Sequence, residues 1–311
     1  DGQRCQGVSI SALGLGCVQF VSPTVEWAIA RMSPTPTPSG SFLPPTPPDV
    51  DTRKDRVTGV DVRVDRVGSG PPLVVLNGLL GLNAHWFGCL GAWSNRAEVF
   101  LVEPPLLEMK GPGCSVDGVT RLIASLLESI VDQPATLIGN SLGGHVALRL
   151  ALERPELVRA VVLVGSSGLF ERTFERGAEH NPSRAYVERK IRDLFHDPSR
   201  MLPGMVDQAY AELSRRSAAR ALVRLGRSAK NDHLGERLGQ IRHPTLLAWG
   251  RNDIVTPPEV AEQFQALIPG ARLEWIDKCG HAPQVERSQE LGEIVARFLD
   301  ELATGRTHEG S

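Results

Sequence analysis

Three residues along the chain have the types and the order that nucleophilic catalysis needs. Ser141 lies in "IGNSLGGHVAL", Asp253 in "LLAWGRNDIVTPP" and His281 in "LEWIDKCGHAPQVE". A serine hydroxyl is a poor nucleophile until a histidine accepts its proton, and an acid behind the histidine fixes the tautomer of the ring. We therefore predict a catalytic triad in which Ser141 is the nucleophile, His281 the base and Asp253 the acid.

The stretch around Ser141 is typical of a strand-to-helix turn that exposes a nucleophile. An apolar run at residues 135–138 precedes the serine, and a helix-like pattern over about 142–153 follows it. The small residues Gly139 and Gly143 would allow a sharp turn, and the N–H of Leu142 would stabilise an oxyanion. Taken alone, the pattern also fits a serine that caps a helix.

A second glycine-containing loop is expected to complete the oxyanion hole. In "VVLNGLLGLNAHW", Asn77 and Gly78 end an apolar run, and the N–H of Leu79 would point at the oxyanion together with that of Leu142. Farther along the same loop, His85 is a candidate substrate-lining residue.

Other residues compete for these roles or lie near the expected site. Asp277 follows a predicted strand, but it comes four residues before His281 and could simply hold the loop. His145 follows Ser141 by one helical turn, and its place within the helix favours a core or lining role. Further candidates for lining the substrate pocket are Asn140, Leu169 and Phe170. Asn140 has no other role that we can assign.

Six short apolar runs, separated by segments of helix length, indicate a parallel sheet. Continuous apolarity means that a strand is buried on both faces, as in a sheet between two layers of helices. The runs are residues 72–78, 98–104, 135–140, 160–165, 245–250 and 272–277. Amphipathic helix patterns occur at residues 119–130, 260–267 and 291–302. The sequence thus predicts an α/β fold with a mostly parallel, doubly wound sheet.

The ends of the chain differ from this pattern. Residues 1–54 include a Pro-rich stretch and are expected to form a disordered tail or linker. After them, Val60, Val62 and Val64 alternate with charged residues, which predicts an antiparallel edge strand. Residues 304–311 are expected to be a C-terminal tail.

One long interval contains helix-compatible sequence but no convincing strand. It covers residues 169–243, between two of the apolar runs. An interval of this length is expected to be a helical insertion rather than a loop, and ligands of α/β sheets bind at the carboxyl ends of the strands. We therefore predict an α/β core of residues 55–168 and 244–303, with residues 169–243 as a lid over the substrate site.

The composition argues against several classes of protein. The chain of 311 residues has a net charge of −2, without the basic excess that binding to nucleic acid needs. Its five cysteines are scattered, so we expect no disulfide framework and no metal site, and the cytoplasm is the simplest location. The apolar stretch at residues 7–21 is too short to span a membrane, but as a signal it would make the protein exported or lipid-anchored. The sequence does not indicate an oligomeric state.

Taken together, these motifs resemble the α/β-hydrolase superfamily over about residues 56–303. The resemblance rests on "GNSLGG", the Asn-Gly loop, "WGRND", "CGHA" and the lid. The family usually has histidine where this chain has Asn77, and we expect the asparagine to brace the loop by hydrogen bonding instead. "GNSLGG" and "GRND" are also similar to bacterial meta-cleavage-product hydrolases. Those enzymes commonly have tryptophan after the catalytic histidine, where this chain has Ala282.

The resemblance and the triad imply a serine hydrolase of small carboxylic esters or related acyl compounds. Its partner would be a small acyl substrate, and its mechanism requires neither a metal nor an organic cofactor. Two alternatives stay open. One is hydrolysis of a carbon–carbon bond in a vinylogous diketone, and the other is a non-catalytic protein that uses the same fold to bind a ligand.

Overall fold

The computed structural model describes residues 49–55, 58–170 and 182–305. The chain divides into two units, Asp1–Thr37 and Pro38–Ser311, and all of the described residues belong to the second unit. Of the expected tails at residues 1–54 and 304–311, residues 1–48 and 306–311 lie outside the described residues, whereas Thr304 is still helical.

An eight-stranded sheet forms the centre of the second unit, in the order β1-β2-β4-β3-β5-β6-β7-β8. The six apolar runs are all strands of this sheet, which confirms the predicted α/β fold. β3 to β8 run parallel to one another, whereas β1 and β2 are antiparallel to their neighbours. The strands are β1 (Asp49–Lys54), β2 (Asp61–Gly68), β3 (Pro72–Leu76), β4 (Glu98–Glu103), β5 (Ala135–Asn140), β6 (Val158–Val164), β7 (Thr245–Gly250) and β8 (Arg272–Ile276).

The first two strands differ from the prediction. Val62 and Val64 are buried in the antiparallel strand β2, but this strand is not at the edge of the sheet, because β1 pairs with residues 61–66 of it. β1 belongs to the stretch that we expected to be tail, so that prediction is wrong for residues 49–54. The described side chains of β1 are exposed, as is common for an edge strand, and exposed positions leave no apolar pattern in the sequence.

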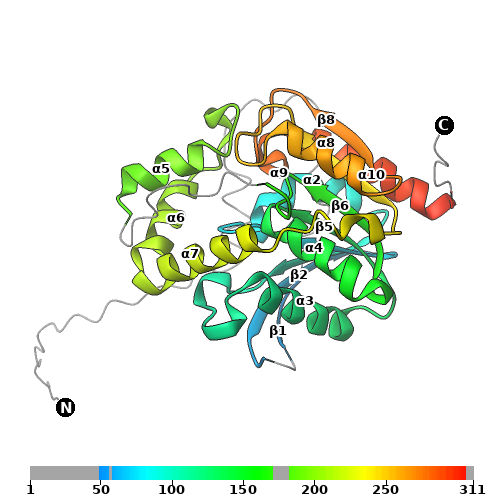
Figure 1. Ribbon diagram of the computed structural model, residues 1–311, viewed down its shortest axis with the longest axis horizontal. Coiled ribbons are helices and arrows are strands. Elements are labelled where there is room, and N and C mark those ends of the chain that lie inside the picture. Colours follow the sequence, from blue (N-terminus) through cyan, green and yellow to red (C-terminus); the bar gives the residue numbers. More distant parts are fainter. Residues whose placement is uncertain (1–48, 56–57, 171–181, 306–311) are drawn as a thin grey trace, which may run out of the picture. The chain divides into compact units, whose positions relative to one another are not determined.

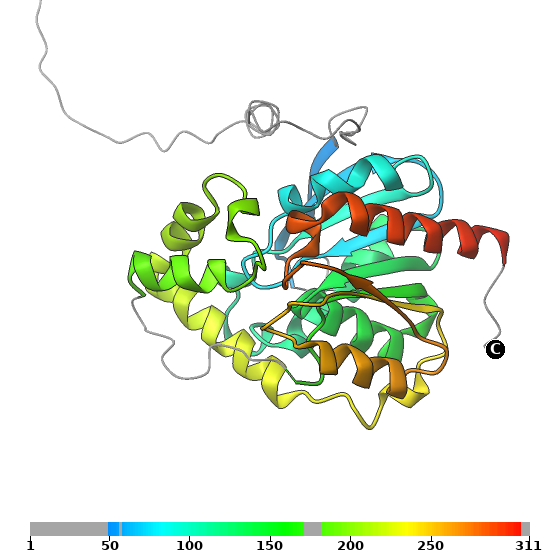
Figure 2. The same ribbon diagram turned by 90° about the horizontal axis from the view of Figure 1, so that it is seen from above.

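Helices cover both faces of the sheet (Figure 1 and Figure 2). On one face lie α3 (Val116–Ile130), α4 (Leu142–Glu153) and α8 (Pro258–Leu267), and on the other lie α2 (Phe87–Trp93) and α10 (Ser288–Thr304). Successive side chains of β3 alternate between the two core clusters, so that Val74 faces the first layer and Val75 the second. This is the doubly wound arrangement that the sequence predicts.

Among the described residues between β6 and β7, where the sequence has no convincing strand, there are three further α-helices. They are α5 (Arg184–Arg192), α6 (Met205–Ser214) and α7 (Arg216–Asn231), and we call residues 182–231 the insertion. Its apolar side chains form a third cluster, which includes Val187, Ile191 and Leu213. Residues 171–181 lie outside the described part of the chain. Within the described residues, no helix has the length and apolarity that crossing a membrane requires.

Candidate active site

Ser141 lies at a sharp turn between β5 and α4. Its backbone has φ +52° and ψ −117°, a conformation that residues other than glycine rarely adopt and that stores strain. Within the described residues, the side chain of Ser141 makes no capping hydrogen bond to α4. Ser141 is thus the N-cap residue of α4 by position, but its hydroxyl does not cap the helix, and the strained turn is of the kind that presents a nucleophile in doubly wound hydrolases.

Three glycines allow this turn because a side chain at any of them would overlap a neighbour. A Cβ at Gly139 would meet the backbone of Gly143, and a Cβ at Gly143 would meet the carbonyl oxygen of Leu76. A Cβ at Gly144 would meet the hydroxyl of Ser166. The close approach of β3, β5 and α4 beneath the serine thus depends on glycine at these positions.

His281 and Asp253 meet in the loops that follow β8 and β7. His281 Nδ1 lies 2.8 Å from Asp253 Oδ2, and both side chains are buried. The N–H groups of Val255 and Thr256 donate to Asp253 Oδ1 at 2.8 and 2.9 Å, and the Thr256 hydroxyl donates to Oδ2 at 2.8 Å. These bonds hold the carboxylate in one orientation toward the histidine. Thr256 is not among the site residues predicted from the sequence, although a threonine three residues after the acid in "DIVT" is a signal for such a bond.

Gly165, directly after β6, packs against this pair and was also missed. It has φ +50°, and a Cβ on it would lie 3.1 Å from both Asp253 Oδ2 and His281 Nδ1. Glycine leaves room for the pair at the carboxyl edge of the sheet. In the sequence, its place at the end of an apolar run is the only hint of this role.

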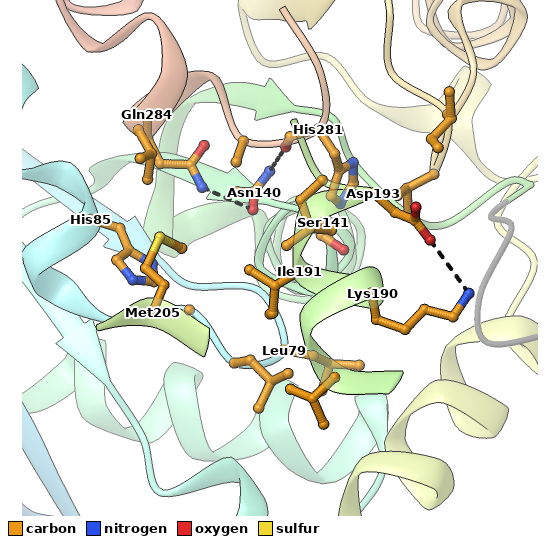
Figure 3. A pocket seen from close by; sticks show the side chains of 18 of the residues that line it. Leu79, His85, Asn140, Ser141, Lys190, Ile191, Asp193, Met205, His281 and Gln284 are labelled. Atoms are coloured by element: carbon orange, nitrogen blue, oxygen red, sulfur yellow. Dashed lines mark hydrogen bonds and ion pairs between the residues drawn. The ribbon is translucent and has the colours of Figure 1, made fainter. Parts of the chain in front are cut away.

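A pocket of about 280 Å³ contains both Ser141 and His281 (Figure 3). Its wall is mainly apolar and comes from the core and from the insertion. Residues in the wall include Leu79, His85, Asn140, Ala282 and Gln284 of the core and Tyr186, Val187, Ile191, Met205 and Leu213 of the insertion. Leu169 and Phe170, which we expected in this wall, are not part of it. Leu169 is buried in the core cluster that includes α4, and Phe170 is 48% exposed.

Of the residues expected to supply the two oxyanion donors, Leu79 lines the pocket and Leu142 directly follows Ser141. Leu142 is the first residue of α4, so its N–H has no acceptor within the helix. Leu79 lines the pocket and belongs to a tight turn in which the N–H of Gly81 donates to the carbonyl of Gly78 at 3.1 Å. A Cβ at Gly78 would lie 3.2 Å from Ser141 Cβ, so this turn comes close to the serine turn.

Asn77 braces the Leu79 turn through buried hydrogen bonds. Its Nδ2 donates to Asn83 Oδ1 at 2.9 Å and to Val102 O at 3.1 Å, and Trp86 Nε1 donates to its Oδ1 at 2.9 Å. Asn83 Nδ2 in turn donates to the buried Asp65 at 3.2 Å. The side chain at position 77 thus supports the loop by hydrogen bonding, as we expected of an asparagine in place of histidine.

Asn140, whose role the sequence leaves open, connects the serine turn to the histidine loop. Its Nδ2 donates to the His281 carbonyl at 3.0 Å and to the Val164 carbonyl at 2.9 Å. Its Oδ1 accepts a bond of 3.2 Å from Gln284 Nε2 (Figure 3). Gln284 is buried in the pocket wall, and within the described residues its Oε1 has no hydrogen-bond partner. A polar group of a substrate could supply that partner.

His85 lines the same pocket, where we expected it. The N–H of Leu82 donates to its Nδ1 at 3.3 Å, which leaves the ring proton on Nε2. Burial lowers the pKa of His85 to about 4, so the ring is neutral at pH 7. His85 can therefore offer a neutral N–H donor to a bound molecule.

The two competing residues lie elsewhere. Asp277 is exposed and forms an ion pair of 2.7 Å with Arg251. His145 is buried in α4, and its Nε2 lies 3.1 Å from Asp232 Oδ2, just after α7. Neither residue belongs to the described wall of the pocket. His145 connects α4 to the end of the insertion, and this favours the core role.

The insertion is tied to the histidine loop by backbone and side-chain bonds. The N–H of His281 donates to the carbonyl of Leu194, which follows α5, at 2.8 Å. The carboxylate of Glu286, which ends the short helix α9 (Pro283–Glu286), is buried. Three backbone N–H groups donate to this carboxylate, those of Gly280 at 2.7 Å, His196 at 3.1 Å and Asp197 at 2.6 Å. One carboxylate thus joins the loop before His281 to the segment after α5.

Other kinds of chemistry have little support at this site. Within the described residues, no group of three or more His, Cys, Asp or Glu side chains is arranged to hold a metal ion. Cys279 is buried two residues before His281, and burial raises the pKa of its thiol, which is the opposite of what a cysteine nucleophile needs.

In hydrolases built on a doubly wound sheet, a serine lies at a strained turn after a central parallel strand. A carboxylate and a histidine lie in the loops that follow two later strands. The site described above has this arrangement. Comparison with known families agrees with this class. The chain belongs to the α/β-hydrolase family, because the model described as "alpha/beta hydrolase fold" matches residues 71–288. It is therefore an enzyme of the α/β-hydrolase type.

Similar proteins include one that is named as an esterase and one that is named as another kind of hydrolase. The chain is 34% identical over 239 residues to a pimeloyl-[acyl-carrier protein] methyl ester esterase of Nitrosomonas europaea, covering 71% of this chain and 93% of that protein. It is 26% identical to a 2-hydroxy-6-oxononadienedioate/2-hydroxy-6-oxononatrienedioate hydrolase of a Pseudomonas species, covering 80% and 95% of the two chains. A solved α/β hydrolase from a metagenome of lagoon sediments at Mar Chica, Morocco, matches with a TM-score of 0.62 and 29% identity, over 81% of this chain and 98% of that one.

Proposed function

We propose that this enzyme hydrolyses small carboxylic esters through an acyl-enzyme on Ser141. The observation that carries the proposal is the 2.8 Å contact between Asp253 Oδ2 and His281 Nδ1, at the pocket that also contains Ser141. An imidazole that donates from Nδ1 to a carboxylate can accept the serine proton at Nε2. The carboxylate also stabilises the imidazolium that forms.

In the first half of the reaction, Ser141 Oγ attacks the carbonyl carbon of the ester while His281 takes the hydroxyl proton. The carbonyl oxygen becomes an oxyanion, for which the N–H groups of Leu79 and Leu142 are the proposed donors. When the tetrahedral intermediate collapses, the bond to the alcohol oxygen breaks. His281 gives its proton to that oxygen, and the alcohol leaves.

In the second half, water attacks the acyl-enzyme. His281 accepts a proton from the water, and the same two N–H groups stabilise the second oxyanion. The bond between the acyl carbon and Ser141 Oγ then breaks, and His281 returns its proton to the serine. The carboxylic acid is released and the enzyme is restored without any metal or cofactor in the cycle.

The wall of the pocket supports a small acyl group that is mostly apolar. Val187, Ile191 and Met205 of the insertion give it an apolar side, while His85 and Gln284 are polar. We propose that the insertion acts as a lid, because its residues form part of this wall. We also propose a cytoplasmic location, since the three cysteines among the described residues are free and buried.

The proposal is tested with a fluorophosphonate probe and a panel of p-nitrophenyl esters of graded acyl length. We expect the wild type to be labelled and to prefer short acyl chains, and we expect Ser141→Ala to lose both labelling and turnover. Asp253→Asn should be labelled slowly, with kcat lowered by about 10³- to 10⁴-fold. A wild type that the probe does not label would rule out a nucleophilic serine, and it would favour the non-catalytic alternative.

Hydrolysis of a carbon–carbon bond in a vinylogous diketone is the second candidate, because the Pseudomonas relative is named for 2-hydroxy-6-oxo dienedioate and trienedioate substrates. The same triad could serve proton transfer in that reaction. Ala282, which lines the pocket next to His281, is the position where such enzymes commonly have tryptophan. Turnover of a dienone chromophore, with no turnover of short p-nitrophenyl esters, would favour this candidate over ester hydrolysis.

Esters carried on a protein form a further group of substrates that we propose for this site. The Nitrosomonas relative is named for the methyl ester of an acyl group on the acyl-carrier protein. In such a substrate, the ester lies at the far end of the acyl chain from its carrier. The enzyme would then bind the chain in its pocket and the carrier on its surface.

A further inference from the structure

Leu80 has a backbone conformation that leucine rarely adopts. Its φ is +61°, in the left-handed region where the Cβ of any residue but glycine crowds the backbone. It is the third residue of the turn that begins at Gly78 and closes with the hydrogen bond from the N–H of Gly81. A turn with a positive φ at its third residue normally has glycine or asparagine there. The leucine side chain is therefore held in this place at a conformational cost.

Two cavities meet at this residue. Leu80 lines both the pocket of about 280 Å³ that contains Ser141 and a second cavity of about 430 Å³. Figure 3 shows three other residues that line both cavities, His85, Ile191 and Met205, in the wall of the pocket. Residues that belong to the walls of two cavities lie between them. We call these residues the partition, which consists of Leu80, Gly81, His85, Ile191 and Met205.

Within the partition, Leu80 differs from the members that belong to the insertion. Ile191 of α5 is buried in the third apolar cluster, so it also holds the insertion together. Met205 is the first residue of α6, and its sulfur accepts a hydrogen bond of 3.3 Å from the N–H of Leu202. Leu80 comes from the core and packs against the same cluster as a partly buried residue. Its side chain thus extends from the core to the insertion, between the two cavities.

The wall of the second cavity combines apolar residues with charged residues that pair with one another. The buried residues of this wall, Leu106 and Ala209, are apolar. Arg215 forms ion pairs with Glu108 and Glu212, and the side chains of these three residues are well exposed. The exposed charges border the solvent, so the buried part of the cavity could hold the end of an alkyl chain.

We propose that Leu80 determines which acyl chains the enzyme prefers, by closing the passage from the pocket to the second cavity. The pocket alone is at the small end of the range for ligand sites, which is about 300–1,000 Å³. Methylene groups that do not fit in it stay in water and add nothing to affinity. Since the second cavity is larger than the pocket, an open passage would more than double the space for the chain. This inference rests on the proposed ester hydrolysis and names a residue that selects among its substrates.

The test compares p-nitrophenyl butanoate with p-nitrophenyl octanoate in Leu80→Ala and Leu80→Gly. Leu80 follows Leu79, a proposed oxyanion donor, so either substitution can change kcat for both esters. The ratio of the two kcat/KM values cancels that effect. A buried methylene raises affinity by about fourfold, and the octanoyl chain is four methylenes longer. We expect the ratio of octanoate to butanoate to rise at least about tenfold above the wild-type ratio.

The two variants complement each other, because Leu80→Gly also relieves the strain of the turn. It therefore allows the measurement even if Leu80→Ala folds poorly. A rise of less than about tenfold in either folded variant overturns the proposal.

Leu107→Ala is the matched control for the size of the deletion. In the described walls, Leu107 belongs to the second cavity and not to the pocket, and it packs against the same apolar cluster as Leu80. This variant enlarges the second cavity but leaves the passage closed, so the ratio should stay within about twofold of the wild-type value. A rise as large as that in Leu80→Ala would show a general loosening of the insertion and would overturn the proposal.

Ala209→Leu tests where the longer chain lies. Ala209 lines the second cavity, and a leucine there would fill part of it. Added to Leu80→Ala, this substitution should return the ratio to within about threefold of the wild-type value. A ratio that stays high would place the octanoyl chain elsewhere and would overturn the proposal.

Direct binding separates failure of this inference from failure of the proposed function. Octanoate is titrated by calorimetry into the full-length enzyme carrying Ser141→Ala, with and without Leu80→Ala. Binding that is at least about tenfold tighter with Leu80→Ala supports the partition even if neither ester is hydrolysed, and in that case only the proposed function fails. Binding that is absent in both proteins, or that tightens by less than this, overturns the role of Leu80.

Discussion

At the scale of single residues, the candidate site depends on groups that fix side chains in place. Asp253 accepts three hydrogen bonds from Val255 and Thr256 besides its contact with His281. Asn140 holds the backbone of His281 from the serine side. These hydrogen bonds fix the orientation of Asp253 and His281. A substitution that shifts either side chain slightly should therefore lower kcat more than it changes KM, because catalysis depends on their exact positions.

Gly165→Ala tests how closely the histidine–carboxylate pair is packed. The new Cβ would lie 3.1 Å from Asp253 Oδ2 and from His281 Nδ1, so the pair must shift by a few tenths of an ångström. We expect kcat for an ester to fall by about tenfold, with KM nearly unchanged. Steady-state kinetics on a soluble p-nitrophenyl ester measures both constants.

Gly270→Ala is the matched control for this variant. Gly270 also has a positive φ, of +71°, but nothing lies within 4 Å of a Cβ at that position. Both substitutions should therefore lower stability through backbone strain, by about 1–2 kcal/mol. Only the one at Gly165 should lower kcat, and equal kcat values in the two variants would contradict the packing argument.

His85 gives the protein a pH dependence that a single substitution can remove. Its pKa is lowered to about 4 by burial, from 6.5 in the unfolded chain. Between these two values the unfolded state binds a proton at this residue and the folded state does not. The free energy of unfolding therefore decreases as the pH falls from 6.5 toward 4.

The measurement compares the wild type with His85→Asn, because the asparagine oxygen can still accept from the N–H of Leu82. One pKa unit corresponds to ~1.4 kcal/mol, and the ring is only half-buried, so its full value is not expected. We expect urea unfolding to show the wild type losing about 1 kcal/mol more than the variant between pH 7 and pH 5. Parallel losses in the two proteins would show that His85 does not titrate in this way.

At the scale of elements, Glu286 joins the histidine loop to the insertion. Its two carboxylate oxygens accept from the N–H groups of Gly280, His196 and Asp197. In Glu286→Gln, the amide NH₂ would replace one of these oxygens and face an N–H donor. We expect a loss of about 1–3 kcal/mol in the free energy of unfolding, and a lower kcat because the histidine loop is no longer fixed.

Glu290→Gln makes the same chemical change at an exposed position of α10 and serves as the control. It should change the free energy of unfolding and kcat very little, since no described backbone N–H depends on it. If the two glutamine variants unfold at the same urea concentration, the carboxylate of Glu286 does not connect the two segments as described.

The sequence could predict those elements whose pattern is local. The parallel strands are buried on both faces, so each appears as a continuous apolar run, and Ser141, Asp253 and His281 follow three of these runs in order. β1 could not be predicted in this way because its described side chains are exposed. Likewise, Asn140 lies 141 residues from the carbonyl that it binds, and Glu286 lies 90 residues from His196. Only the fold brings such partners together.

At the scale of the whole molecule, the charges separate into a basic insertion and an acidic body. The insertion has a net charge of +6 in a chain of net charge −2. A charge distribution of this kind acts on an acidic protein before contact, whereas a neutral ester does not respond to it. The association rate of the carrier-bound substrate should therefore depend on ionic strength.

We expect kcat/KM for the pimeloyl methyl ester on acyl-carrier protein to fall by about tenfold between 50 and 500 mM NaCl, because the screening length shrinks to a few ångströms. Turnover of dimethyl pimelate should stay within about twofold, and this rules out a general effect of salt on the enzyme. In the triple variant Arg216→Glu/Arg220→Glu/Arg227→Glu, which reverses three exposed charges of α7, the salt dependence of the carrier-bound ester should flatten or reverse in sign, because attraction has become repulsion. A wild type whose two substrates respond equally to salt would show that the charge of the insertion does not guide the substrate to the site.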